Sequence, residues 1–119
     1  MKRIALVLVL MLCATSLFAA DAKTTIRAMA DRFEAGVRNG DAAQMASIYA
    51  DDAILMPPNA PAANGRAAIQ EYWAGMLAMG KGDIKLTFDE VMVDGKTAIE
   101  RGRWAFTLTP NGATEPIHD

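Results

Sequence analysis

The sequence has little of the chemistry that most enzymes use. It contains one cysteine, Cys13, and one histidine, His118, in 119 residues. Cys13 lies in an amino-terminal segment that we expect to be removed, so the rest of the chain offers no thiol for a disulfide, a metal site or a nucleophile. We expect no metal, because a metal site needs several converging His, Cys or carboxylate ligands.

The chain also has few residues that could support nucleophilic catalysis. Beyond the amino-terminal segment the only serine is Ser47, and a Ser–His–Asp triad would have to combine it with His118. Neither residue lies in the sharp turn that presents a nucleophile. The chain also lacks a glycine-rich phosphate loop, so we expect no cofactor.

Basic runs are absent, apart from a short basic start. The formal net charge is −2, and it becomes −4 when Lys2 and Arg3 are removed with the amino-terminal segment (−2 − 2 = −4). Nucleic-acid binding needs a basic patch or stripe. We therefore expect no nucleic-acid partner.

The amino-terminal segment, residues 1–20, has the pattern of a secretory signal peptide. Lys2-Arg3 is followed by an unbroken apolar run over residues 4–12 and by small residues that reach Ala19-Ala20. A membrane anchor is the alternative, but the run falls short of the ~20 apolar residues that a span needs. We expect cleavage after Ala19 or Ala20, a secreted or periplasmic protein, a single domain over residues 21–119, and no membrane contact after cleavage.

A first helix is predicted to begin at Thr24 or Thr25 and to bury one face. Apolar residues recur three and four positions apart from Ile26 to Val37, which is the spacing of one helical face. The charged residues of this segment, Glu34 among them, fall mostly off that face and are expected to be solvated.

A second helix is predicted to follow Asn39-Gly40. Asp41 can cap it, and Gln44 three residues later can complete a capping box. Apolar residues at helical spacing continue to Tyr49, and Asp51-Asp52 is expected to end the helix.

A short strand is predicted next, over residues 53–56. Pro57-Pro58 ends it, because proline cannot donate to a strand ladder. The small and polar residues that follow are expected to form a loop. Asn64-Gly65 is then expected to open a third helix, whose apolar face includes Ile69 and Trp73.

The remainder of the chain is predicted to be sheet. Lys81-Gly82-Asp83 is expected to break the chain after the third helix, and alternating apolar and polar residues predict a strand over residues 84–93. A shift in this alternation at Asp89-Glu90 predicts a bulge. Asp94-Gly95 predicts a hairpin that leads into a return strand over residues 97–109.

The two faces of the return strand differ. Trp104, Phe106 and Leu108 share one face, which we expect to be the inner one. Arg101 and Arg103 lie on the other face, which is expected to meet solvent or a second subunit.

A turn at residues 110–112 is followed by the start of a third strand that runs only to Asp119. A strand able to pair along residues 104–109 needs several more residues, so we expect the protein to continue for roughly 20–30 residues. An open apolar sheet edge would be an association hazard.

An ordered set of residues runs through the middle of the chain. It consists of Phe33, Gly40-Asp41, the run IYADDAILMPP over residues 48–58, Gly65-Arg66, Ala68-Ile69 and Tyr72-Trp73. The set resembles the NTF2-like superfamily in its SnoaL-like and DUF4440-type branch, and the resemblance covers residues 24–119. It implies an α+β cone in which three N-terminal helices pack into a strongly curved, mostly antiparallel sheet around an apolar pocket. It also implies a homodimer.

The best-known chemistry of this fold is ketosteroid isomerisation, in which an Asp base and a Tyr oxyanion donor work in an apolar pocket. The resemblance places Phe33 at the position of the Tyr, eight residues before Asp41, and Met56 at the position of the Asp. Neither Phe nor Met transfers protons. The isomerase mechanism therefore does not carry over, and the replacements make the pocket more apolar.

Two residues remain as candidates for catalysis. Glu100 shares a strand face with Trp104 and Phe106, and a carboxylate held among aromatic rings is a candidate acid or base. The alternative is that Glu100 sits at the mouth of the cone or pairs with an arginine such as Arg66. His118 could reach the same face from the next strand, or it could simply be solvated.

Three functions stay open at this point. The first is an exported domain that binds a small apolar molecule without covalent chemistry. The second is a cyclase, isomerase or dehydratase that uses Glu100 and His118. The third is a dimerisation scaffold. The expected pocket lining is Phe33, Tyr49, Met56, Trp73, Trp104 and Phe106. Residues such as Tyr49 and Trp73 are more often part of an ordinary core than of a ligand site, so that alternative stays open for both.

Overall fold

The computed structural model describes the backbone of residues 2–118 and the side chains of residues 20–118. The chain divides into two compact units. The first unit combines residues 1–28 with residues 87–103, and the second combines residues 29–86 with residues 104–119. The expected chain end at Asp119 lies outside the described residues, as do the side chains of most of the expected signal peptide.

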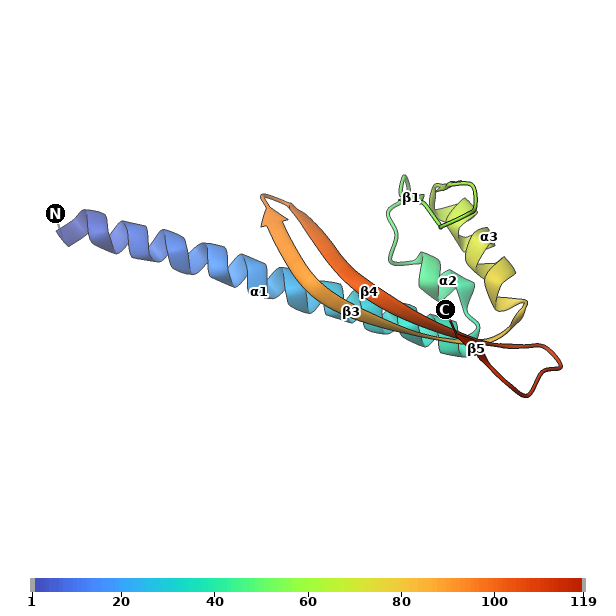
Figure 1. Ribbon diagram of the computed structural model, residues 1–119. Helices are drawn as coiled ribbons and strands as arrows, with labels where there is room; N and C mark the ends of the chain where they lie inside the picture. Colours follow the sequence, from blue (N-terminus) through green and yellow to red (C-terminus); the bar gives the residue numbers. More distant parts are fainter. Residues whose placement is uncertain (1, 119) are drawn as a thin grey trace. The chain divides into compact units, whose positions relative to one another are not determined.

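The first helix, α1, runs from Lys2 to Asn39 without a break (Figure 1). The prediction that it begins at Thr24 or Thr25 is wrong. The Thr24 hydroxyl donates to the carbonyl oxygen of Ala20, one turn earlier, at 3.1 Å. Thr24 therefore behaves as a mid-helix threonine rather than as a cap. In the part of α1 with described side chains, no apolar stretch is long enough to cross a membrane.

The second helix, α2, is short and spans Ala42–Ala46. Its predicted cap is confirmed, because the Asp41 carboxylate accepts a hydrogen bond from the Gln44 backbone N–H at 2.9 Å. The prediction that the Gln44 side chain completes a capping box is wrong. The Gln44 side chain instead donates to the carbonyl oxygen of Arg32 in α1, at 2.8 Å. This bond ties α2 to α1. Because α2 ends at Ala46, the prediction that the helix continues to Tyr49 is wrong.

A small two-stranded sheet precedes α3. Strand β1 (Ile54–Leu55) pairs antiparallel with β2 (Ala63–Asn64), in a segment that was expected to be loop. The predicted strand, β1, therefore pairs with β2, a strand that was not predicted and that follows the proline-rich turn. Helix α3 (Arg66–Leu77) begins after Gly65 as predicted, and Gly65 has a φ of 84°, which favours glycine.

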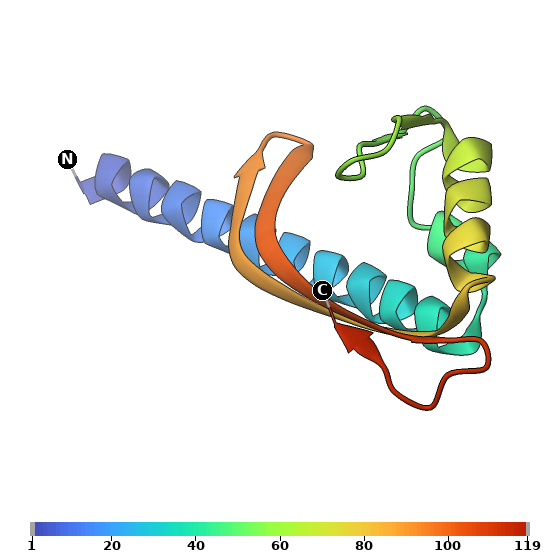
Figure 2. The ribbon, with the colours of Figure 1, turned by 45° about the vertical axis from the view of Figure 1, so that its right-hand side comes forward.

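The main sheet has the strand order β3-β4-β5, so β4 lies in the middle (Figure 2). Strand β3 spans Gly80–Asp94, which shows that the break expected at residues 81–83 is wrong. Strand β4 spans Thr97–Pro110, and the hairpin between them turns at Gly95, whose φ is 57°. Burial alternates along β3 but shifts at residues 89–90. The bulge expected there stays a prediction.

Glycine lets two backbones approach within this sheet. A Cβ atom on Gly102 would collide with the carbonyl oxygen of Thr87, and one on Gly80 would collide with that of Thr109. A glycine inside a strand often marks such a close approach. The conformation of β3 and β4 therefore depends on these two positions.

The second unit holds the buried core. Phe33 and Val37 from α1 pack with Met45 from α2 and Ile84 from β3. Glu34 is buried beside them, contrary to the prediction that it is solvated. Its carboxylate accepts a hydrogen bond from the Leu86 backbone N–H at 2.9 Å and lies 3.7 Å from the Lys85 ammonium. A residue off the apolar face of α1 thus fixes α1 to β3.

The first unit is held mostly by polar contacts. Arg103 reaches the Asp89 carboxylate with two nitrogen atoms, at 2.8 and 3.2 Å, and Arg101 lies 3.1 Å from Glu90. The Arg27 guanidinium stands 5.0 Å from the centre of the Phe88 ring, within the range of a cation–π contact. The arginines predicted for the outer face thus form ion pairs across the hairpin.

Candidate functional site

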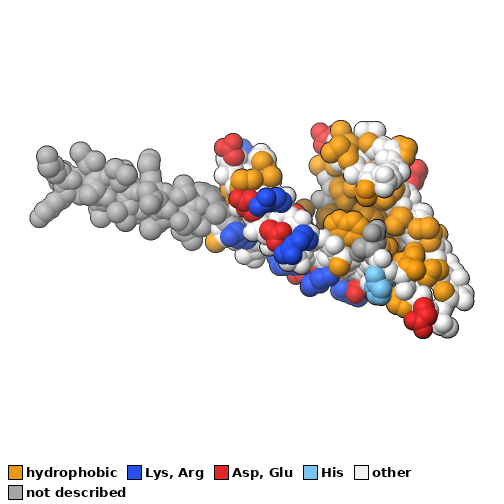
Figure 3. Space-filling view, in the orientation of Figure 1, with side chains coloured by type: hydrophobic (Ala, Val, Ile, Leu, Met, Phe, Trp, Pro, Cys, Tyr) orange, Lys and Arg blue, Asp and Glu red, His pale blue; other side chains and the backbone are white. Residues whose placement is uncertain are grey.

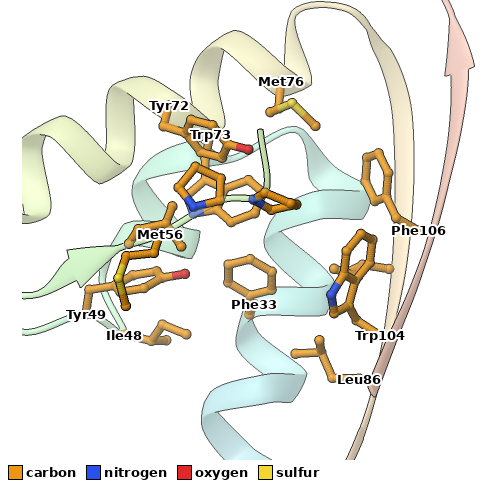
Figure 4. A pocket seen from close by; sticks show the side chains of 14 residues that line it. Phe33, Ile48, Tyr49, Met56, Tyr72, Trp73, Met76, Leu86, Trp104 and Phe106 are labelled. Atoms are coloured by element: carbon orange, nitrogen blue, oxygen red, sulfur yellow. The ribbon is translucent and has the colours of Figure 1, made fainter. Parts of the chain in front are cut away.

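A cavity of about 530 Å³ lies within the second unit. This volume falls within the range of small-molecule sites, about 300–1,000 Å³. Figure 4 shows aromatic side chains from helices and strands pointing into the same space. The lining consists of Phe33, Ile48, Tyr49, Leu55, Met56, Pro57, Pro58, Tyr72, Trp73, Met76, Ile84, Leu86, Trp104 and Phe106.

Three of the lining rings pack edge to face. Phe33 and Trp73 have ring centres 5.2 Å apart at an angle of 79°, and Tyr72 and Trp73 have centres 5.0 Å apart at 77°. T-shaped pairs of this kind are favourable because the edge of one ring meets the face of the other. They fix Trp73 in place between α1 and its own helix, α3.

A cluster of hydrogen bonds around Arg66 sets the position of Tyr49. The Arg66 side chain donates from Nε to the Tyr49 carbonyl oxygen at 2.8 Å and lies 2.7 Å from the Asp51 carboxylate. The Arg66 backbone N–H donates to the Asp51 carbonyl oxygen at 3.2 Å. The start of α3 therefore holds the segment that carries Tyr49.

The cavity contains few polar groups. The Trp73 indole nitrogen is buried and has no hydrogen-bond partner among the described residues. Burial raises the pKa of the Tyr49 hydroxyl above its ordinary value, and the Trp73 indole lowers it by less. A buried donor without a partner costs about 1–3 kcal/mol, so the placement of Trp73 calls for an explanation.

The six side chains predicted to line a pocket all line this cavity. Phe33 is 4% exposed, whereas Met56 and Trp104 are 79% and 51% exposed. The other eight lining residues were not predicted to line a pocket. Four of them could have been found from their position in the sequence, because they lie next to or near a predicted lining residue. Leu55, Pro57 and Pro58 lie beside Met56, and Tyr72 precedes Trp73.

Glu100 belongs to the first unit, whereas the residues that line the cavity all belong to the second. Its side chain is exposed, and its carboxylate lies over Gly102, where a Cβ atom on that glycine would meet it at 2.5 Å. The expectation for Glu100 rested on a carboxylate held among aromatic rings. Its exposed position does not provide that environment.

His118 lies on the face of β4 opposite to that of Trp104 and Phe106. It pairs with Thr107 in the register between β5 (Ile117–His118) and β4, and its Nδ1 atom lies 3.2 Å from the Thr107 hydroxyl. Directly paired residues point to the same face of a sheet. The β5 register therefore directs His118 away from the cavity-lining face.

Solved structures share this fold. An NTF2-like protein with a cystatin-like fold from Novosphingobium aromaticivorans is 22% identical and has a TM-score of 0.70, with 89% of this chain and 70% of that chain covered. An NTF2-like superfamily protein from Salmonella enterica is 18% identical, with a TM-score of 0.70 and coverage of 83% and 73%. A ketosteroid isomerase-like protein from Erwinia carotovora atroseptica is 24% identical, with a TM-score of 0.62 and coverage of 78% and 72%.

No curated protein matches the chain. A family model described as SnoaL-like domain matches residues 26–118. The match confirms the predicted family, and the solved structures confirm the predicted α+β fold. The chain belongs to the SnoaL-like domain family, and it shares its fold with solved structures described as NTF2-like.

Proposed function

We propose that the second unit binds a small, uncharged, largely apolar molecule in its cavity, without covalent chemistry. The observation that carries this proposal is the composition of the wall. All fourteen lining side chains are aliphatic, aromatic, proline or methionine, and none of them carries a charge at neutral pH. Burial of apolar surface favours binding by about 25 cal/mol per Å², so such a wall favours apolar ligands.

The methionines and prolines at the edge of the cavity support the same proposal. Met56, next to Pro57 and Pro58, is 79% exposed, so its thioether reaches solvent at the rim. Methionine is flexible and polarisable and adapts to irregular apolar shapes. A rim of this kind suits a ligand that enters from solvent.

The acid–base alternative has less support. Glu100 and His118 are both exposed, and His118, which belongs to the same unit as the cavity, does not line it. General acid–base catalysis needs a titratable group within hydrogen-bond reach of the reacting atom. If the protein is an enzyme of this kind, Glu100→Gln should abolish turnover and leave apolar binding intact.

Fluorene, an uncharged tricyclic hydrocarbon, is a suitable probe for the binding proposal. Calorimetry should detect its binding to the wild-type protein. Met76→Trp places a larger side chain in the wall and should weaken binding at least tenfold. Met79→Trp is the matched control, because Met79 is 47% exposed and does not line the cavity. Equal binding by the two variants, or no binding by the wild type, would contradict the proposal.

We also propose that the protein is exported and forms a homodimer. The amino-terminal pattern of residues 1–20 supports export, and the family resemblance supports the dimer. Mass spectrometry of protein isolated from its own host would reveal cleavage after Ala19 or Ala20. Sedimentation at several concentrations would reveal the dimer, and a monomer at all of them would leave the scaffold function without support.

A further inference from the structure

Met56 combines two properties that no other described methionine of the second unit shares. It lines the cavity, and it is 79% exposed. Met76 also lines the cavity but is half-buried, whereas Met79 is 47% exposed and does not line it. Figure 4 shows the Met56 side chain, with its sulfur atom, among the side chains of the cavity wall. A chemical change at this sulfur atom is therefore open to reagents in solvent and alters the wall itself.

Hydrogen bonds of the backbone hold Met56 at the rim. Met56 directly follows β1, which pairs with β2. The Gly65 N–H donates to the carbonyl oxygen of Ala53, the residue before β1, at 2.7 Å. These bonds do not involve the Met56 side chain, so they are independent of the chemical state of its sulfur atom.

The thioether of an exposed methionine reacts with peroxides. The sulfur lone pair attacks one oxygen atom of hydrogen peroxide, the O–O bond breaks as the S–O bond forms, and a proton moves to the departing oxygen, which leaves as water. The sulfur is oxidised by two electrons, and the peroxide is reduced. The product, methionine sulfoxide, is polar, whereas the wall of the cavity is largely apolar.

We propose that Met56 is an oxidation site through which a hydroperoxide lowers the affinity of the cavity for its apolar ligand. The sulfoxide oxygen is a hydrogen-bond acceptor that water satisfies in the free protein. A ligand seated over Met56 removes that water, and the adjacent Pro57 and Pro58 have no backbone N–H to replace it. The inference rests on the proposed function of the cavity, and it adds a condition under which the ligand is released.

The test treats the protein with hydrogen peroxide and follows two readouts. Mass spectrometry of peptides should find Met56 converted to the sulfoxide before Met76, while Met45, which is 0% exposed, stays reduced in the folded protein. Calorimetry should show that the affinity for fluorene falls about 5-fold or more as Met56 is oxidised, the loss expected for one polar group left without a partner. Methionine sulfoxide reductases, supplied with a dithiol, should restore the affinity.

Two leucine variants separate Met56 from the other methionines. Met56→Leu has no sulfur atom at the rim, so its affinity for fluorene should be the same before and after peroxide treatment. Met79→Leu is the matched control, because Met79 is exposed but does not line the cavity. The affinity of this variant should fall on oxidation as that of the wild type does.

The outcomes separate this inference from the proposed function. If the untreated wild type binds fluorene and oxidation of Met56 leaves the affinity unchanged, the oxidation site is wrong and the apolar cavity stands. The same conclusion follows if peroxide weakens binding by Met56→Leu as much as by the wild type, or if Met76 is oxidised before Met56. If the untreated wild-type protein does not bind fluorene, both proposals fail.

Discussion

The two units of the chain use the same kinds of element but differ in what holds them. In the second unit the helices bring Phe33, Val37 and Met45 against Ile84, and each of these side chains is at most 7% exposed. Among the described residues of the first unit, no side chain is buried to this degree. Figure 3 shows Lys, Arg, Asp and Glu side chains gathered over the β3–β4 hairpin.

The sequence of α1 explains the difference. Residues 20–28 (ADAKTTIRA) contain one large apolar side chain, Ile26, whereas residues 29–39 contain Met29, Phe33 and Val37 at helical spacing. Alternation in a strand creates an apolar face, but a second layer must supply side chains that cover it. The alternation of apolar and polar residues along β3 and β4 is therefore necessary for a core, but a core forms only where a second layer covers the apolar face.

The largest expected effect tests this contrast with two isoleucines. Ile69 in the second unit is 0% exposed, and Ile99 in the first unit is 55% exposed. Ile69→Ala should lower the free energy of unfolding by about 2–5 kcal/mol, because it leaves a cavity in a packed core. Ile99→Ala should change it by less than about 1 kcal/mol, since the side chain is half in solvent. Urea unfolding measures both, and similar losses would mean that the first unit is packed as well.

A second prediction concerns the close approach of strands in the first unit. Gly102→Ala places a Cβ atom against the Thr87 carbonyl oxygen, so the strands must separate, at a cost of about 1–3 kcal/mol. Gly75→Ala is the control, because nothing lies within 4 Å of its Cβ position in α3. That change should stabilise the protein by about 0.5–1 kcal/mol. Thermal unfolding would show whether each variant is more or less stable than the wild type. A stabilised Gly102→Ala variant would contradict the close approach.

The buried carboxylate of the second unit provides the third prediction. Glu34→Leu removes the carboxylate that accepts from the Leu86 N–H and should destabilise the protein by about 1–3 kcal/mol. Glu34→Gln keeps an acceptor oxygen there and should cost less. Chemical denaturation distinguishes the two variants. An equal cost for both would show that the charge of Glu34, rather than its hydrogen bond to β3, is what matters.

The smallest effect is expected at the ion pairs of the first unit. The Arg103 and Asp89 side chains are 74% and 37% exposed, and exposed pairs of this kind contribute little because water and salt screen them. Arg103→Gln should leave the unfolding midpoint almost unchanged, and any difference should shrink as salt is added. A large loss that resists salt would mean that this hairpin is stabilised as strongly as the second unit.

Much of the site was readable from particular residues. Spacing alone placed Phe33 and Trp73 on buried helical faces, and alternation placed Trp104 and Phe106 on one side of β4. The position of Met56 came instead from the family resemblance. These predictions succeeded because period and burial are linked within a single helix or strand. The failures involve partners distant in sequence. The Gln44 side chain bonds to the Arg32 carbonyl oxygen rather than to its own cap, and the buried Glu34 carboxylate accepts from the Leu86 N–H of β3.

The sequence by itself determined the family, the order of the helices and of the strands other than β2, and the apolar character of the cavity wall, because these follow from residue types and their spacing. The tertiary structure decided where the titratable groups lie. The β5 register turned His118 to the face of Thr107, and the position of Glu100 over Gly102 left it exposed. Such placements depend on register and on contacts between distant segments, neither of which a local pattern encodes.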